Sequence, residues 1–326
     1  MNLLLWIVLG LLLALVVAAM IVPITVLVWW AGWTQRAAKQ DDVSAPASLS
    51  PTFPVAPASG PFLVYLSGVG DIANDFQTTY EDALLTEIAA RVPGLVFTSD
   101  VFAFSVENLG MTSQRQLGWF WDWVNKERLR KGGRLRALGQ LINLRNILQL
   151  TVSADARYGP VYNCSVAEII LHSLVRHGYA PGSGAPVTLL GYSGGGQIAL
   201  ATAEYVQATL QAPVQVISMG GLMNSSRSLQ TIVRLTHLYG AKDYAQRVAD
   251  WIFPARWPLF KQSDWNQAVA TGRLRRVCLG PMGHTGRRSY LDGTVFVEDG
   301  RSYRTVTADA IGALVAQMPA QRMSLR

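Results

Sequence analysis

The sequence is poor in the residues that usually build disulfide and metal sites. Its 326 residues include two cysteines, Cys164 and Cys278, and four histidines. Two thiols outside any C-x-x-C pair are too few for a disulfide framework, and no Cys/His cluster suggests structural zinc. We therefore expect buried, unbridged cysteines and no metal or other cofactor.

Charged residues are also scarce, at 15% of the chain against 50% hydrophobic residues. Such a composition can form a large core, which excludes a disordered chain. The net charge is +7, but residues 126–145 alone hold seven basic residues and one acidic residue. The basicity is thus one local patch, and we expect no nucleic-acid partner.

Residues 3–30 contain no charge at all. A membrane-spanning helix needs about 20 apolar residues, and Trp29, Trp30 and Trp33 would form an aromatic belt at one interface. We expect residues 1–33 to be a single-pass membrane anchor. A cleaved signal peptide is the alternative, but its apolar stretch is shorter and follows basic residues. Arg36 and Lys39 after the segment favour a cytoplasmic folded domain by the positive-inside rule.

Residues 34–60 are rich in Pro, Ala and Ser and indicate an extended linker. From residue 61 to 326, short apolar runs alternate with helical patterns. The expected strands are residues 62–67, 95–98, 187–190, 214–218, 235–239 and 275–279. This alternation predicts one α/β domain with a mostly parallel, doubly wound sheet and flanking helices. Active groups are expected in the loops that follow the strands.

One such loop has the sequence Gly191-Tyr192-Ser193-Gly194-Gly195 and lies between an expected strand and an expected helix, 197–210. This is a G-x-S-x-G motif in a strand–turn–helix context, in which a sharp turn exposes the serine hydroxyl. Side chains at the two outer glycines would collide with the neighbouring strand and helix. The alternative is a tight turn or a phosphate-binding loop, although the lysine of a P-loop is absent.

The motif in this setting resembles the nucleophile elbow of the α/β-hydrolase superfamily, in particular of its esterases and lipases. The resemblance covers residues 61–326 and implies a serine nucleophile, an acid and a histidine in that chain order. Asp243 follows the expected strand 235–239, and His284 lies in a glycine-rich loop after the last expected strand. We therefore predict a triad of Ser193, Asp243 and His284. Asp243 could instead cap a helix, and Asp264 is the second candidate for the acid.

Acyl transfer also needs backbone N–H groups that stabilise an oxyanion. Gly194 is the expected first donor, and Gly68 or Val69, after the first expected strand, is the second. The His-Gly-Gly-Gly run of many esterases is absent, so the choice between Gly68 and Val69 stays open. Three polar residues follow this loop and could contact substrate or cap a helix: Asp71, Asn74 and Asp75.

Residues 106–162 form an insert that carries tryptophans, the basic patch and a leucine-rich stretch of helical spacing. This insert could lie on an anionic membrane, cover the site as a lid, or pack as a helical pair with a solvated basic face. Together these features predict a serine hydrolase that cleaves an ester, thioester or other acyl bond of a lipid-like or membrane-near substrate. The alternatives are an acyltransferase with the same triad and a non-catalytic, membrane-bound protein that binds a partner.

Overall fold

The fold is seen in a computed structural model, which describes residues 60–72, 79–106, 108, 110–111, 118–130 and 136–318, with Gly10 on its own. Apart from Gly10 and Gly60, the proposed anchor and the linker lie outside these residues, as does the pair Asn74 and Asp75. In the described part, no helix is both long enough and apolar enough to cross a bilayer.

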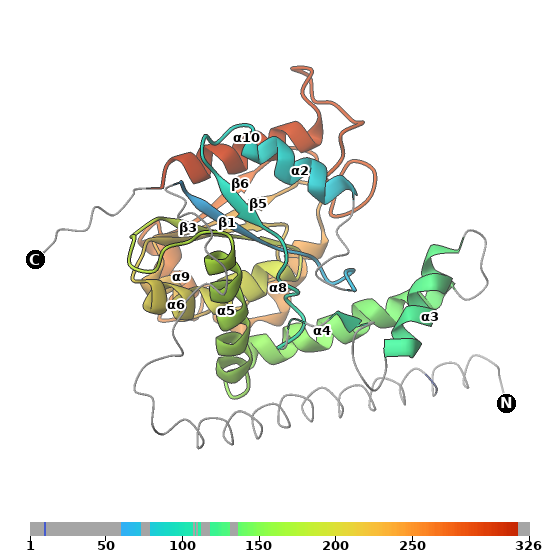
Figure 1. The fold of residues 1–326 in the computed structure, drawn as a ribbon, viewed down its shortest axis with the longest axis horizontal. Coiled ribbons are helices and arrows are strands. Elements are labelled where there is room, and N and C mark those ends of the chain that lie inside the picture. Colours follow the sequence, from blue (N-terminus) through green and yellow to red (C-terminus); the bar gives the residue numbers. More distant parts are fainter. Residues whose placement is uncertain are drawn as a thin grey trace, which may run out of the picture.

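A six-stranded sheet forms the centre of the molecule (Figure 1). Its strand order is β2-β1-β3-β4-β5-β6, and every neighbouring pair is parallel. The prediction of a parallel sheet is confirmed, and each strand was expected to within two residues of its observed bounds. The strands are β1 Phe62–Leu66, β2 Val96–Thr98, β3 Val187–Tyr192, β4 Val214–Met219, β5 Arg234–Tyr239 and β6 Leu274–Cys278.

Helices cover both faces of the sheet (Figure 1). The helices are α2 Thr79–Ala89, α3 Gly118–Leu129, α4 Gln140–Ala154, α5 Gly159–Arg176, α6 Gly195–Leu210, α7 Ser228–Thr231, α8 Val248–Ile252, α9 Asp264–Ala270 and α10 Tyr303–Ala316. Short 3-10 turns occur at η2 Arg136–Gly139, η3 Ala245–Arg247 and η4 Pro254–Arg256. Helices α2 and α10 lie on one face, and α5 and α6 lie on the other.

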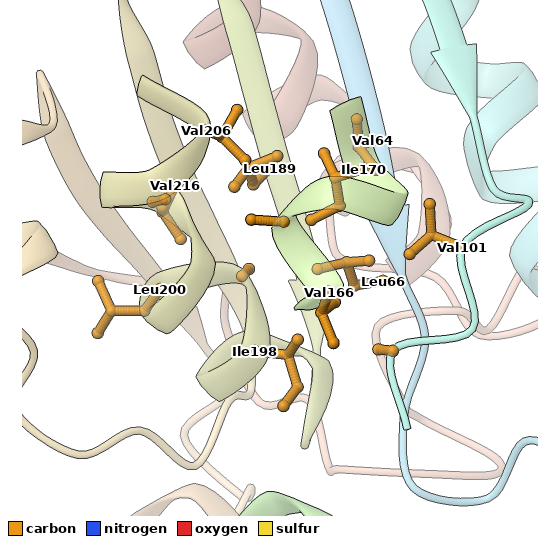
Figure 2. Packing of buried hydrophobic residues seen from close by; sticks show 14 of the residues in the cluster. Val64, Leu66, Val101, Val166, Ile170, Leu189, Ile198, Leu200, Val206 and Val216 are labelled. Atoms are coloured by element: carbon orange, nitrogen blue, oxygen red, sulfur yellow. The ribbon is translucent and has the colours of Figure 1, made fainter. Parts of the chain in front are cut away.

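Alternation along the strands divides the core into two layers. In β1, Val64 and Leu66 pack with α5 and α6, while Leu63 and Tyr65 pack with α2 and α10. Figure 2 shows the first layer, in which valines, leucines and isoleucines from β1, β3, β4, α5 and α6 meet. Because both faces are covered, every residue of the central strands β1, β3 and β4 is buried, as expected of parallel strands.

The insert packs onto this core. Trp121 and Val124 of α3 and Ile142 and Leu150 of α4 belong to the same buried cluster as the α5–α6 layer. This packing favours the helical-pair interpretation of the insert. Trp119, also on α3, is 72% exposed.

Candidate active site

The loops after β1, β3, β5 and β6 meet at the carboxyl edge of the sheet. Strand β3 ends at Tyr192, and α6 begins at Gly195, so the turn between them contains only Ser193 and Gly194. Ser193 has a φ of 51°, in the left-handed region that non-glycine residues rarely occupy. Such a conformation costs roughly 1–3 kcal/mol and is found mainly at functional positions.

The glycines of the motif allow this turn to lie against its neighbours. A Cβ at Gly195 would stand 2.2 Å from the Leu66 carbonyl oxygen of β1. A Cβ at Gly191 would stand 2.4 Å from the Gly195 carbonyl oxygen in the first turn of α6. Both distances are too short for a side chain, so the elbow depends on glycine at each position. These are the collisions with strand and helix that the sequence predicts.

Ser193, His284 and Asp243 form one hydrogen-bonded chain. The His284 Nε2 atom lies 2.8 Å from Ser193 Oγ, and His284 Nδ1 lies 2.9 Å from Asp243 Oδ2. Asp243 is fully buried, and Ser193 is 7% exposed. The structure brings Asp243 to the histidine. Asp264, the second candidate, lies on α9, where its carboxylate accepts a hydrogen bond from Gln230.

The carboxylate of Asp243 is held in its ionised form. Burial raises the pKa of Asp243, but hydrogen bonds from His284 and Tyr290, the attraction of His284 and the Gln246 N–H together bring it below its ordinary value. An ionised carboxylate only accepts hydrogen bonds, so the His284 Nδ1 atom carries the proton. In the neutral ring the Nε2 atom is then free to accept the Ser193 hydroxyl proton.

Two tyrosines support this chain, and neither was predicted from the sequence. The Tyr290 hydroxyl donates to Asp243 Oδ2 at 2.6 Å and accepts from the Gly240 N–H at 2.8 Å. The Tyr192 hydroxyl donates to the His284 carbonyl oxygen at 2.6 Å, and the Tyr192 ring stacks on the imidazole with centroids 5.7 Å apart. Tyr192 lies inside the elbow motif, so its position was the one sequence signal available.

Asp243 also caps the turn that follows it. Its Oδ1 atom accepts the Gln246 N–H at 3.3 Å, while its Oδ2 atom faces His284. One oxygen of Asp243 thus makes the capping contact considered from the sequence, and the other makes the contact with the histidine.

The loop after β1 lies beside the nucleophile. A Cβ at Gly68 would stand 3.4 Å from Ser193 Cβ, and a Cβ at Gly194 would stand 2.5 Å from Val69 Cγ1. Gly194 directly precedes α6, whose N-terminal end carries a partial positive charge. All three residues predicted to supply oxyanion donors thus lie around Ser193. Asp71, at the end of this loop, is buried, with its carboxyl group turned to Ser67 and Glu81.

Comparison with known proteins adds little to this geometry. No protein-family model matches the chain, and no curated protein matches it in sequence. Among solved structures, the chain is similar to LpqC, a poly(3-hydroxybutyrate) depolymerase from Bordetella parapertussis. The two chains are 13% identical, the alignment covers 81% of this chain and 82% of LpqC, and the TM-score is 0.38. At such a TM-score the similarity carries no weight for activity.

Proposed function

We propose that this chain is a serine hydrolase of the α/β-hydrolase type that cleaves an acyl bond. The observation that carries the proposal is the continuous hydrogen-bonded chain from Ser193 Oγ through His284 to Asp243. Three side chains from three separate loops have the distances that general-base activation of a serine requires. The strained φ of Ser193 is a second, independent sign of a functional position.

The proposed reaction begins with attack of Ser193 Oγ on the acyl carbonyl carbon. His284 Nε2 takes the hydroxyl proton, and Asp243 stabilises the imidazolium that forms. The carbonyl oxygen becomes an oxyanion, which the Gly194 N–H and one N–H of the Gly68–Val69 loop stabilise. The alkoxide or thiolate leaving group then departs with the proton from His284, and an acyl-enzyme remains. Water, activated by His284, then attacks the ester carbonyl, releases the acid and restores Ser193.

We further propose an apolar, lipid-like acyl substrate. Support comes from an apolar surface on residues 244–260, which begins one residue after Asp243. Trp251 and Leu259 of this surface are 80% and 82% exposed, far more than is usual for such side chains. The other exposed members are Tyr244, Val248, Ile252, Trp257 and Phe260. Exposed apolar side chains that gather on one surface are typical of binding sites, and a segment rich in them that directly follows the acid loop in the chain suits an ester with long apolar groups.

The test of the nucleophile is labelling by a fluorophosphonate probe, with wild type compared with Ser193→Ala. We expect labelling of the wild type, none of Ser193→Ala, and loss of turnover in a folded His284→Ala variant. The non-catalytic alternative would gain support if folded wild type resisted the probe. Trapping of the acyl group by an added alcohol or amine, in preference to water, would identify an acyltransferase.

Anchoring of the chain by residues 1–33, with the domain in the cytoplasm, stays a proposal from the sequence. A single cysteine introduced at Ser48 of the linker, in a chain whose two native cysteines are replaced, provides the test. A membrane-impermeant maleimide should label it only after the cells are opened. Labelling of intact cells would place the domain outside.

A further inference from the structure

The loop beside the nucleophile is held by the two helices of the insert. Asn146 of α4 donates through Nδ2 to the carbonyl oxygens of Val69 and Asp71, each at 2.8 Å. Arg128 of α3 donates through Nη1 to the Gly70 carbonyl oxygen at 2.7 Å. Three consecutive carbonyl groups of the loop therefore bond to side chains that lie 58 to 77 residues away in the chain.

The orientation of the Asn146 amide is fixed on both sides. Asn146 is fully buried, and its Oδ1 atom lies 3.0 Å from Arg145 Nη1. A guanidinium group only donates, so the atom that faces Arg145 is the amide oxygen and the Nδ2 atom faces the loop. Both Nδ2 hydrogens then have acceptors, which is what a buried amide requires. Arg145 is itself held by the Phe104 carbonyl oxygen.

The position of this loop matters for the oxyanion. A donor must lie about 2.7–3.1 Å from the oxyanion, and a rigid donor gives the full benefit because it does not have to reorganise. Gly68 and Val69 already lie against Ser193 and Gly194. The hydrogen bonds to the Val69 and Asp71 carbonyls fix the peptide planes that follow the expected donor in the chain.

We propose that Asn146 is a positioning residue that sets the second oxyanion donor of the Gly68–Val69 loop, with Arg128 as its support. The two helices of the insert then hold the loop that carries the second oxyanion donor, and we call this role the brace. The insert is neither a lid nor only a packed helical pair. This inference rests on the proposed hydrolase activity. It concerns transition-state stabilisation, so it predicts a loss in kcat with little change in KM.

The experiment uses the full chain and a p-nitrophenyl ester that wild type hydrolyses. In Asn146→Leu both carbonyls lose their donor while the side-chain volume stays similar. We expect kcat to fall about 30- to 100-fold, because a misplacement of about 1 Å costs around 100-fold, and KM to stay within twofold. Binding of a trifluoromethyl ketone, whose hemiketal oxyanion occupies the same donors, should weaken by a similar factor. The pH profile should keep its shape, since Ser193, His284 and Asp243 are untouched.

The matched control is Gln149→Met on the same helix. Gln149 is a second buried amide of α4, 5% exposed, and its Oε1 atom has no hydrogen-bond partner among the residues that the structure describes. Its replacement should leave kcat within twofold. If Asn146→Leu does not fold, Arg128→Met tests the same brace from α3, with an expected loss of about tenfold.

The outcomes separate the two proposals. A wild type that neither hydrolyses esters nor reacts with fluorophosphonate overturns the hydrolase and the brace together. An active wild type with folded Asn146→Leu and Arg128→Met variants of unchanged kcat overturns the brace alone. The same holds if Asn146→Leu and Gln149→Met lose kcat equally, because the effect then comes from α4 as a whole.

Discussion

Replacement of Asp71 by Asn tests a buried carboxyl pair beneath the loop after β1. Asp71 and Glu81 are 7% and 3% exposed, and the Tyr65 hydroxyl donates to Glu81 Oε1 at 2.7 Å. Burial, and then the charge of Glu81, raise the pKa of Asp71 to about 8, against the opposing hydrogen bond from Ser67 and the attraction of Arg128. At neutral pH the native state therefore keeps a proton on Asp71 that the unfolded chain has released.

The sign of the effect on stability follows from this proton. Between about pH 4 and pH 8 the native state binds more protons than the unfolded state, so the free energy of unfolding falls as pH rises. Asp71→Asn removes this cost, and its stabilisation should grow from near zero at pH 4 to a plateau above pH 8. A shift of about four pKa units corresponds to at most about 6 kcal/mol. Because penetrating water and relaxation of the structure reduce the cost of a buried charge, we expect about 2–3 kcal/mol at pH 9.

The measurement is urea unfolding of wild type and Asp71→Asn at pH 5, 7 and 9, followed by tryptophan fluorescence. Asp100→Asn is the control, for which the change in the free energy of unfolding should have the opposite sign. Burial raises the pKa of Asp100, but hydrogen bonds from Ser173 and Thr98 and the attraction of Arg176 bring it below its ordinary value. Asp100→Asn should therefore lose stability by an amount that is constant from pH 5 to pH 9 and that declines only at lower pH. A difference between wild type and Asp71→Asn that does not vary with pH would refute the reasoning.

Two further substitutions test the site from other sides. Tyr290→Phe removes the donor to Asp243 and leaves the Gly240 N–H without its acceptor. We therefore expect a loss of about 2 kcal/mol in the free energy of unfolding and a fall of about tenfold in kcat for ester hydrolysis. Unchanged stability and turnover would show that this hydroxyl does not position the acid. Gly195→Ala places a methyl group 2.2 Å from the Leu66 carbonyl oxygen. We expect the free energy of unfolding, measured in urea, to fall by about 3 kcal/mol or more. A stable, active Gly195→Ala protein would contradict the packing of the elbow.

The sheet was predictable because its strands are short apolar runs that alternate with helical patterns. The helix boundaries were harder to predict. Helix α5 begins at Gly159, within the stretch 106–162 that was assigned to the insert, and Pro160 at its first turn is the signal that was missed. Proline favours the first turn of a helix because its fixed φ is compatible there and its missing N–H is not needed.

The members of the proposed triad were predictable for a different reason. Each follows a strand in a parallel sheet, so chain order alone brings Ser193, Asp243 and His284 to the same edge. Tyr290 and Asn146 carry no such local pattern. Tyr290 lies 47 residues from Asp243, and Asn146 lies 77 residues from Val69. Their contacts arise only when distant segments pack, which periodicity and spacing do not reveal.

The basic patch shows that the sequence also does not reveal which charged residues face the interior of the domain. From the sequence it could have been a membrane-facing surface, but part of it is used inside the domain. Arg128 and Arg145 turn to backbone carbonyl oxygens, while Lys126 pairs with Asp122 on the surface of α3. Arginine can bury its long apolar stem and still donate through its guanidinium group. Sequence therefore located the charge without showing which residues face solvent.

The two sides of the proposed site are supported by different parts of the fold. On the acid side, Gln246 donates to Asp243, and its Oε1 atom lies 3.2 Å from Nε2 of the buried His237 on β5. Burial lowers the pKa of His237 to about 4, despite the hydrogen bond to Gln246, so the ring is neutral. Its Nε2 atom then donates to Gln246, and its Nδ1 atom accepts from Ser218 on β4.

These partners are strand residues and the loop next to them, so the acid side takes its geometry from the sheet. The oxyanion side takes its geometry from α3 and α4, which enter the chain between β2 and β3. A perturbation of the insert should therefore weaken oxyanion stabilisation and leave the hydrogen bonds between Ser193, His284 and Asp243 in place. This division explains why Asn146 and Tyr290, which are both buried, should affect different catalytic properties. Asn146 should affect the stabilisation of the transition state, and Tyr290 should affect the position of the acid.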